Sequence, residues 1–283
     1  MPHRPFRFGV TGRGDSLASW RDFARKAEDL GYSTLLLPDH FGPQLAPLVA
    51  LGVAAQSTRT LRFGTLVLDN DFRHPTVLAK EAATLDLLTE GRFELGIGTG
   101  STPADNEQSG IPLDPPAVRY ERIVETICIL KSFFADESVT FQGRHYQVSN
   151  LRAYPKAVQQ PHPPLLMGAR GPRMLRLAAR EADIIGVMGS DADAAEGMEI
   201  VRAAAGERFA HLEFNALYLR VQVDGQPAQS GTEFSHLAGL FGSRSEIIEY
   251  LQRRRETLEV SYIAVIGTAI GAFAPVVAEL AGK

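Results

Sequence analysis

Asp39 and His40 stand near the end of the apolar stretch STLLLPDHF. Both residues can exchange protons or contact a cofactor. A histidine beside an aspartate at the end of a strand suits acid–base chemistry, because the charge of histidine changes near neutral pH. A polar turn with satisfied hydrogen bonds is the alternative. Farther along, the run Arg73-His74-Pro75 stands directly before a helix pattern, where helix capping explains these residues as well as ligand binding does.

Three glycines in the stretch FELGIGTG, at positions 96, 98 and 100, follow another apolar run. Ser101 stands where the motif G-x-G-x-x-G has its last glycine, so the resemblance to a dinucleotide-binding loop is weak. Because glycine lacks a Cβ, the backbone here can approach a flat ligand or form a tight turn. A plain turn at the end of a strand, without a ligand, is the alternative.

A third motif, Gly168-Ala169-Arg170-Gly171-Pro172-Arg173, follows the apolar run PPLLM and precedes a helix pattern. Proline is typical of the first helical position, and the free backbone N–H groups of a helix N-terminus attract anions. Arginine adds bidentate hydrogen bonds to phosphate oxygens. The motif therefore predicts a phosphate site, with an ordinary glycine-rich turn and surface arginines as the alternative.

Other kinds of site are not indicated. The seven histidines lack the spacing of metal ligands, and the sequence has neither a G-x-S-x-G elbow nor a Walker loop. The single cysteine, Cys128, excludes an internal disulfide. Because Cys128 falls inside an amphipathic helix pattern, we expect a buried structural thiol rather than a nucleophile.

Strand-like runs alternate with helix patterns almost from end to end of the chain. Eight such runs predict an α/β protein, a single TIM-barrel domain over residues 1–283 of the (β/α)8 type, with its active site at the carboxyl ends of the strands. A doubly wound open sheet is the alternative fold. A loop is expected over 99–117 and a small β-hairpin insertion over 138–148. The expected strands are 6–10, 33–41, 61–68, 92–98, 163–168, 182–187, 214–223 and 260–267, and the expected helices include 47–56, one from Pro75, 192–209, and 242–259 with a Ser243/Glu246 capping box.

The composition limits the partners. A net charge of −4 and a pI near 6.0 give no electrostatic footprint for nucleic acid. No apolar run is long enough to span a membrane, and the N-terminus lacks the apolar segment of a signal peptide. We therefore expect a soluble, cytoplasmic protein that acts on a small-molecule substrate. The oligomeric state is not set by the sequence, and a homodimer is one option.

Several segments together resemble the bacterial-luciferase-like family. They are LGYSTLLLPDHF, LRFGTLVLDNDFRHPTVLAKEAATLDLLTEGRFELGIGTG, PPLLMGARGPRMLRLAAREADIIG and VSYIAVIG with AFAPVVAEL, and they span nearly the whole chain. Within that family the sequence is most similar to the branch that uses the deazaflavin coenzyme F420 rather than reduced FMN. The resemblance implies a (β/α)8 barrel with the ring system lying across the C-terminal mouth.

The resemblance also implies roles for individual residues. Asp39 and His40 would lie beside the deazaflavin ring, and Leu66-Val67 would form a strand bulge with a non-prolyl cis peptide bond that supports the ring face. The glycines of FELGIGTG would then serve a flavin-like ligand at a barrel mouth. The implied cofactor contacts are Asp39, His40, Leu66, Val67, Thr99, Gly100 and the phosphate loop Gly168, Ala169, Arg170 and Gly171.

The expected activity is hydride transfer between coenzyme F420 and a small organic substrate, with His40 as the catalytic residue. Ser101 stands where sugar-phosphate dehydrogenases of this family carry a glutamate, so that substrate is in doubt. Two alternatives stay open: an FMN-dependent monooxygenase supplied by a separate flavin reductase, and a non-catalytic flavin-binding protein.

Overall fold

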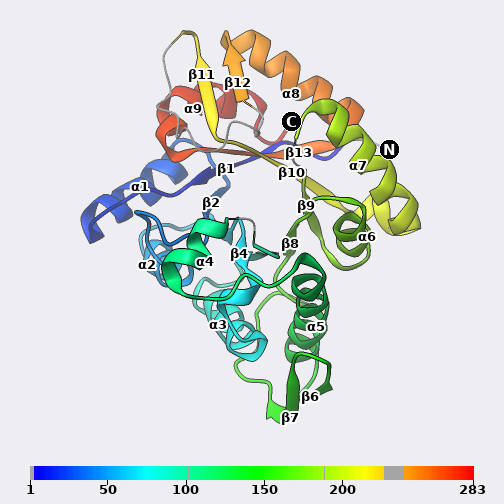
Figure 1. Ribbon diagram of the computed structural model, residues 1–283. Coiled ribbons are helices and arrows are strands. Elements are labelled where there is room, and N and C mark those ends of the chain that lie inside the picture. The colour runs from blue at the N-terminus through cyan, green and yellow to red at the C-terminus, as the bar shows by residue number, and fades with distance from the viewer. Residues whose placement is uncertain (1–2, 101, 188, 226–238) are drawn as a thin grey trace. The chain divides into compact units, whose positions relative to one another are not determined.

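The computed structural model describes residues 3–100, 102–187, 189–225 and 239–283 (Figure 1). The chain divides into two compact units, each described by itself. The terminal unit comprises Met1–Leu36, Ser57–Arg62 and Ala169–Lys283, and the central unit comprises Leu37–Gln56 and Phe63–Gly168. A single domain over residues 1–283 stays a prediction.

The terminal unit contains five parallel strands in the order β2-β1-β13-β10-β9. Most of their residues are apolar and buried, as is typical of parallel strands covered on both faces. All six residues of β13 are buried. In the core, the ring centroids of Phe8 and Phe273 lie 6.0 Å apart. The bounds are β1 Arg7–Thr11, β2 Thr34–Leu37, β9 Ile184–Gly186, β10 Glu213–Tyr218 and β13 Val260–Val265.

Serine residues cap three helices of the terminal unit. Ser16, Ser190 and Ser243 each accept a hydrogen bond from the backbone N–H three residues later, and each is part of a capping box. The predicted box of Ser243 and Glu246 is confirmed. The helix expected over 192–209 ends earlier and continues as a 3₁₀ helix. The bounds are α1 Leu17–Asp29, α6 Pro172–Glu181, α7 Asp191–Ala205, η2 Gly206–His211, α8 Arg244–Leu258, η3 Gly267–Ala269 and α9 Ile270–Leu280.

The expected single strand over 214–223 is wrong. Strand β10 ends at Tyr218, and the following β11 (Arg220–Val223) pairs in parallel with β12 (Gly239–Gly242) in a separate two-stranded sheet. Apolar residues continue across the break, so the pattern of hydrophobicity could not show it.

The central unit contains four parallel strand segments around β5 (Phe93–Gly98), which pairs with β3 (Arg62–Thr65), β4 (Leu68–Asp69) and β8 (Leu165–Gly168). The strand expected over 61–68 is interrupted between β3 and β4. The interruption contains the cis peptide bond between Leu66 and Val67 that the family resemblance implied.

Each α-helix of the central unit begins with a proline in its first turn, where the missing N–H costs nothing. The expected loop over 99–117 is wrong in part, because it contains α4. This short helix has Pro103 at its start and Gly110 in the left-handed region at its end. The predicted hairpin is confirmed as an antiparallel pair. The bounds are α2 Pro47–Ala55, η1 Asn70–Phe72, α3 Pro75–Leu88, α4 Pro103–Ser109, α5 Pro116–Ala135, β6 Ser138–Gln142 and β7 Gln147–Arg152.

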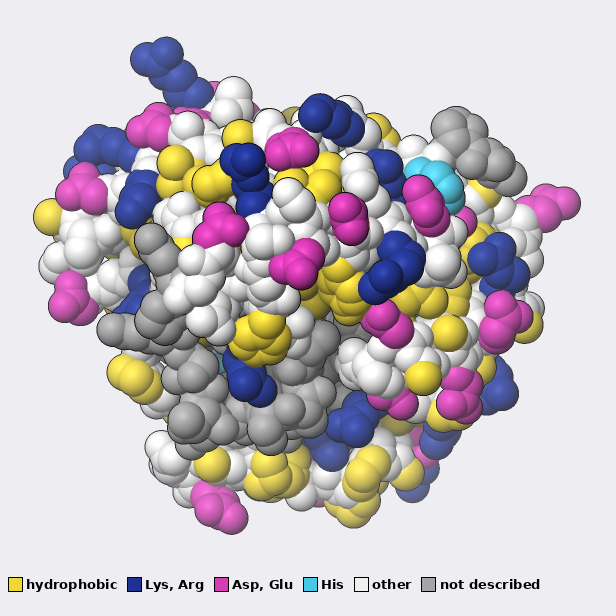
Figure 2. Space-filling model, turned by 90° about the horizontal axis from the view of Figure 1, so that it is seen from above, with side chains coloured by type: hydrophobic (Ala, Val, Ile, Leu, Met, Phe, Trp, Pro, Cys, Tyr) yellow, Lys and Arg dark blue, Asp and Glu magenta, His cyan; other side chains and the backbone are white. Residues whose placement is uncertain are grey.

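The exposed surface of α5 corrects one expectation. Cys128 is exposed, so the expected burial of its thiol is wrong. The helical period places Cys128 opposite the buried face of α5, which carries Ile123, Ile127 and Leu130. No helix among the described residues is long and apolar enough to cross a membrane. Figure 2 shows acidic and basic side chains interspersed over the face that it presents.

Candidate active site

His40 lies in the segment that follows β2, and helix α4 holds its imidazole ring. The ring Nδ1 lies 2.7 Å from Oδ2 of Asp105, and the other oxygen of Asp105 accepts the backbone N–H of Phe41 at 2.9 Å. The side chain of Asp105 is 11% exposed and that of His40 is 35% exposed. A buried carboxylate therefore orients a partly accessible histidine. The sequence predicted His40 as a candidate but missed Asp105.

Asp39 is held from two sides. The guanidinium of Arg73 donates to both carboxylate oxygens, at 2.5 Å and 3.2 Å, and the backbone N–H of Asp69 donates to Oδ2 at 3.2 Å. This ion pair gives Arg73 a structural role that the sequence left undecided. His74 acts as the N-cap of α3, since its ring accepts the backbone N–H of Thr76. The capping interpretation is therefore confirmed for His74.

The glycines at the end of β5 are explained by close contacts with the chain itself. A Cβ on Gly96 would lie 1.8 Å from the carbonyl oxygen of Thr65, and a Cβ on Gly98 would lie 2.9 Å from Cγ2 of Val67. The Thr65 hydroxyl also bridges the backbone N–H and carbonyl of Gly96, each at 2.8 Å. Glycine is required here because the interrupted strand between β3 and β4 comes so close. A ligand is not needed to explain Gly96 and Gly98.

Gly100 is also in close contact with the chain itself. Its φ of 76° is in the left-handed region, and a Cβ would lie 2.1 Å from Oδ2 of Asp69. Arg119 fixes this turn by donating from Nη1 to the carbonyl oxygens of Thr99 and Gly100, both at 2.8 Å. The backbone of Thr99 and Gly100 is thus held in place by the chain itself. Their role as cofactor contacts stays a prediction.

The carboxyl group beside this turn titrates in an unusual range. Burial raises the pKa of Asp69 to about 6, and the negative charges of Asp71 and Asp39 act in the same direction. The backbone N–H of Asp71, at 2.9 Å, and the charge of Arg119 partly offset the increase. Perturbed acids of this kind are common at functional sites, although structural networks produce them as well.

The predicted phosphate loop belongs to two parts of the chain: Gly168 ends β8 in the central unit, while Ala169, Arg170 and Gly171 belong to the terminal unit. Gly171 has a φ of 77° and precedes Pro172, the first residue of α6. The first turn of α6 contains no acidic residue, so no carboxylate of that turn repels an anion at this helix N-terminus.

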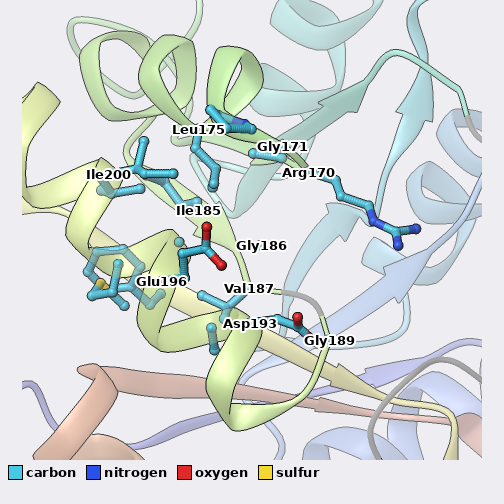
Figure 3. Close-up of a pocket in the computed structure, with 17 residues that line it drawn as sticks. Arg170, Gly171, Leu175, Ile185, Gly186, Val187, Gly189, Asp193, Glu196 and Ile200 are labelled. Carbon is cyan, nitrogen blue, oxygen red and sulfur yellow. The ribbon is translucent and has the colours of Figure 1, made fainter.

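A cavity of about 400 Å³ adjoins this loop within the terminal unit (Figure 3). Its walls come from α6, β9, α7 and β10, and they combine apolar residues, Leu175 and Ile185 among them, with charged ones such as Asp193. Arg170 extends away from these two residues in Figure 3. Hydrogen bonds from Ser190 lower the pKa of Asp193, and the charge of Arg170 contributes to the same decrease. The cation expected to bind phosphate is therefore already attracted by one carboxylate.

The structure thus groups Asp39, His40, Leu66, Val67, Thr99 and Gly100 in the central unit, and the loop from Ala169 to Gly171 in the terminal unit. Ser101, whose identity put a sugar-phosphate substrate in doubt, lies outside the described residues. Among the residues that the structure describes, no group of three His, Cys, Asp or Glu side chains could hold a metal ion.

Comparison with known proteins adds a family and two sets of relatives. The family model described as luciferase-like monooxygenase matches residues 3–260. An F420-dependent glucose-6-phosphate dehydrogenase from Microbacterium testaceum is 35% identical over 190 residues, which cover 63% of this chain and 55% of that protein. The enzyme of the same name from Kineococcus radiotolerans is 34% identical over 191 residues, 64% of this chain and 56% of that protein. The matched region thus spans little more than half the length of these relatives.

Solved structures resemble the chain over nearly its whole length. An F420-dependent tetrahydromethanopterin reductase from Methanopyrus kandleri gives a TM-score of 0.82 with 17% identity and covers 98% of this chain and 99% of that one. A long-chain alkane monooxygenase gives 0.83 with 15% identity, covering 99% and 92%. At these identities the likeness establishes the fold, which is the luciferase-like (β/α)8 barrel. The predicted fold class is confirmed, and the doubly wound sheet is rejected.

Proposed function

Since the chain belongs to the family of luciferase-like monooxygenases, we propose that it is an oxidoreductase that transfers a hydride between coenzyme F420 and a small organic substrate. The observation that carries the choice of cofactor is the match to F420-dependent glucose-6-phosphate dehydrogenases at 34–35% identity. Two of the solved structures of the same fold are F420-dependent enzymes, the tetrahydromethanopterin reductase and a secondary alcohol dehydrogenase with a TM-score of 0.80.

The residues present fit a ligand with a flat ring and a phosphate group. Arg119 fixes the backbone of the turn at Thr99 and Gly100, and the N-terminus of α6 has no acidic residue in its first turn. In this proposal Asp39, His40, Leu66, Val67, Thr99 and Gly100 hold the ring, and Gly168, Ala169, Arg170 and Gly171 hold the phosphate.

When bound, the deazaflavin supplies the carbon that accepts or gives up the hydride. The chain supplies proton transfer. Hydride addition to a carbonyl leaves an oxygen that requires a proton, which the imidazolium form of His40, oriented by Asp105, donates; in the oxidation of an alcohol the neutral ring accepts the proton instead. A positioned acid or base of this kind typically contributes about 10²–10⁴-fold to the rate.

We propose an alcohol, a carbonyl compound or an activated alkene as the substrate class, rather than a sugar phosphate. Ser101 replaces the glutamate expected for a sugar-phosphate dehydrogenase. Phe41, which directly follows His40, is 51% exposed and packs on Phe72 with 5.1 Å between ring centroids. An exposed aromatic ring next to the catalytic residue suits an apolar substrate better than a phosphate.

An FMN-dependent monooxygenase with a separate reductase is the second candidate, supported by the family description and by monooxygenases of the same fold. The oriented pair of His40 and Asp105 argues against a protein that only binds flavin, because binding alone needs no oriented proton donor.

Fluorescence titration of the purified protein with F420 and with FMN tests the proposal. We expect low-micromolar or tighter binding of F420 and weaker binding of FMN. Equal affinities, or a preference for FMN, would count against the F420 assignment and favour the monooxygenase. The titration needs no substrate, so it can precede a screen of enones, quinones and simple alcohols.

A further inference from the structure

Helix α4 places one carboxylate against two consecutive residues of the segment after β2. Asp105 lies in the first turn of α4 and is buried, the residue as a whole being 8% exposed. Its Oδ2 meets Nδ1 of His40 at 2.7 Å, and its Oδ1 accepts the backbone N–H of Phe41 at 2.9 Å. Both oxygens of a buried acid are therefore used to fix the position of a single neighbouring segment.

The contact to His40 also decides where the imidazole carries its proton. An ionised carboxylate can only accept hydrogen bonds, so the ring nitrogen that faces it must be the N–H. In the neutral ring the lone pair is then on Nε2. We propose that Asp105 is a positioning residue that fixes the Nδ1–H tautomer of His40, so that proton exchange with the substrate takes place at Nε2.

Asp39 is adjacent in sequence to His40, but its two oxygens are engaged by Arg73 and by the backbone N–H of Asp69. Asp105 is the partner that the structure gives to Nδ1 of His40. The kinetic part of this inference rests on the proposed function, whereas the tautomer part does not.

An amide in place of the carboxylate separates positioning from packing. Asparagine has nearly the same shape as aspartate, but only one of its two terminal atoms is an acceptor. It can accept the hydrogen bond of the Phe41 N–H or that of a His40 Nδ1–H, but not both. If the oxygen stays on the Phe41 N–H, the NH₂ group faces Nδ1 and favours the Nε2–H tautomer of His40.

The test compares D105N with E107Q, which removes a negative charge from an exposed position of the same helix. The tautomer is read from ¹⁵N NMR shifts of the imidazole nitrogens, at alkaline pH and without cofactor, with H40Q identifying the His40 signals. We expect the Nδ1–H tautomer in the wild type and in E107Q, and a shift toward Nε2–H in D105N. With a substrate, D105N should lower kcat at least about tenfold while KM and F420 affinity change less than about threefold.

An Nε2–H tautomer in the wild type would overturn the proposal, whether or not D105N folds. The same tautomer in wild type and folded D105N would also overturn it. If D105N shifts the tautomer but H40A turns over normally, the catalytic role of His40 in the proposed function fails, while the positioning by Asp105 stands. If both variants lose turnover and the tautomer shifts, both proposals are supported.

Discussion

The surroundings of His40 and those of Arg170 differ in how firmly the protein holds their polar groups. In the central unit, His40 is bound to Asp105 and Asp39 is bound to Arg73 in a bidentate ion pair. Within the described part of the chain, the interaction found for Arg170 in the terminal unit is attraction to Asp193, without a hydrogen bond.

This difference matches the work proposed for each region. Groups that stabilise a transition state must be oriented before the substrate arrives, because reorganisation during the reaction raises the barrier. A phosphate can instead be bound by the backbone N–H groups of a helix N-terminus, with an arginine side chain adding charge-assisted hydrogen bonds. We therefore expect substitutions around His40 to change stability and turnover, and those around Arg170 to change binding.

The largest effect is expected when the ion pair of Asp39 is broken. Arg73→Met leaves a carboxylate whose side chain is 9% exposed without its cation. Losing one partner of a buried pair costs about 3–5 kcal/mol, and the partial exposure of Arg73 favours the lower end, about 3 kcal/mol. Urea denaturation measures this loss against Arg176→Met, a change at an exposed position of α6. Equal stabilities of the two variants would show that the pair is a loose surface contact.

The second prediction concerns the proton-transfer residue itself. His40→Ala should lower turnover by at least about 10²-fold, since general acid–base catalysis contributes about 10²–10⁴-fold. Because the ring is only one of several proposed cofactor contacts, F420 affinity should stay within about tenfold. Steady-state kinetics and the fluorescence titration measure the two effects, with His211→Ala as a control at an exposed site. Normal turnover would reduce His40 to a packing role, and Ser101, a tyrosine or water would then supply the proton.

The third prediction addresses the loosely held region. Arg170→Ala should weaken F420 binding by about 1–3 kcal/mol, the range for losing a charge-assisted hydrogen bond, and should leave thermal stability unchanged. Arg176→Ala, an exposed position of the same α6, serves as the matched control. Unchanged affinity in a folded Arg170 variant would mean that backbone N–H groups bind the phosphate alone, or that the phosphate lies elsewhere.

Sequence patterns predicted the parts of the fold that depend on local order. Proline at helix starts and apolar runs in strands identify α3, β5 and β13, because both signals act within a few residues. Helix α4 was missed because its residues, PADNEQS, form a polar segment without an apolar face. The break between β10 and β11 was missed because the apolar residues continue through it.

The site was predictable where it depends on strand ends, and hidden where it depends on partners distant in sequence. Asp39 and His40 follow a buried strand, which singles them out. Their partners are 34 and 65 residues away, Arg73 and Asp105 respectively, and nothing in the local pattern joins them. The glycines of β5 show the same limit, because their spacing suggested a ligand, whereas the close neighbours are Thr65 of β3 and Val67 of the interruption that follows it.

The smallest effect is expected from the pH dependence of Asp69, the buried carboxyl beside Gly100. Burial raises its pKa from 3.8 to about 6, so the folded protein binds this proton more tightly than the unfolded chain does. The resulting stabilisation is complete below about pH 4 and is lost as the pH rises through about 6. An amide at this position is neutral throughout, so Asp69→Asn should lack this loss. The unfolding free energy of the variant relative to wild type should therefore increase from about pH 4 to about pH 7.

Urea denaturation at several pH values across this window measures this difference in unfolding free energy. Asp29→Asn, at an exposed position, is the control, and its difference from wild type should not change with pH, which gives a flat line. A flat line for Asp69→Asn would mean that Asp69 titrates as it does in the unfolded chain, with its carboxylate hydrated despite its position beside Gly100. The central unit would then hold its acids less uniformly than the ion pair of Asp39 indicates. A rising line would place an acid that titrates near neutral pH beside the Thr99–Gly100 turn, so that F420 binding through this turn should depend on pH over the same interval as stability.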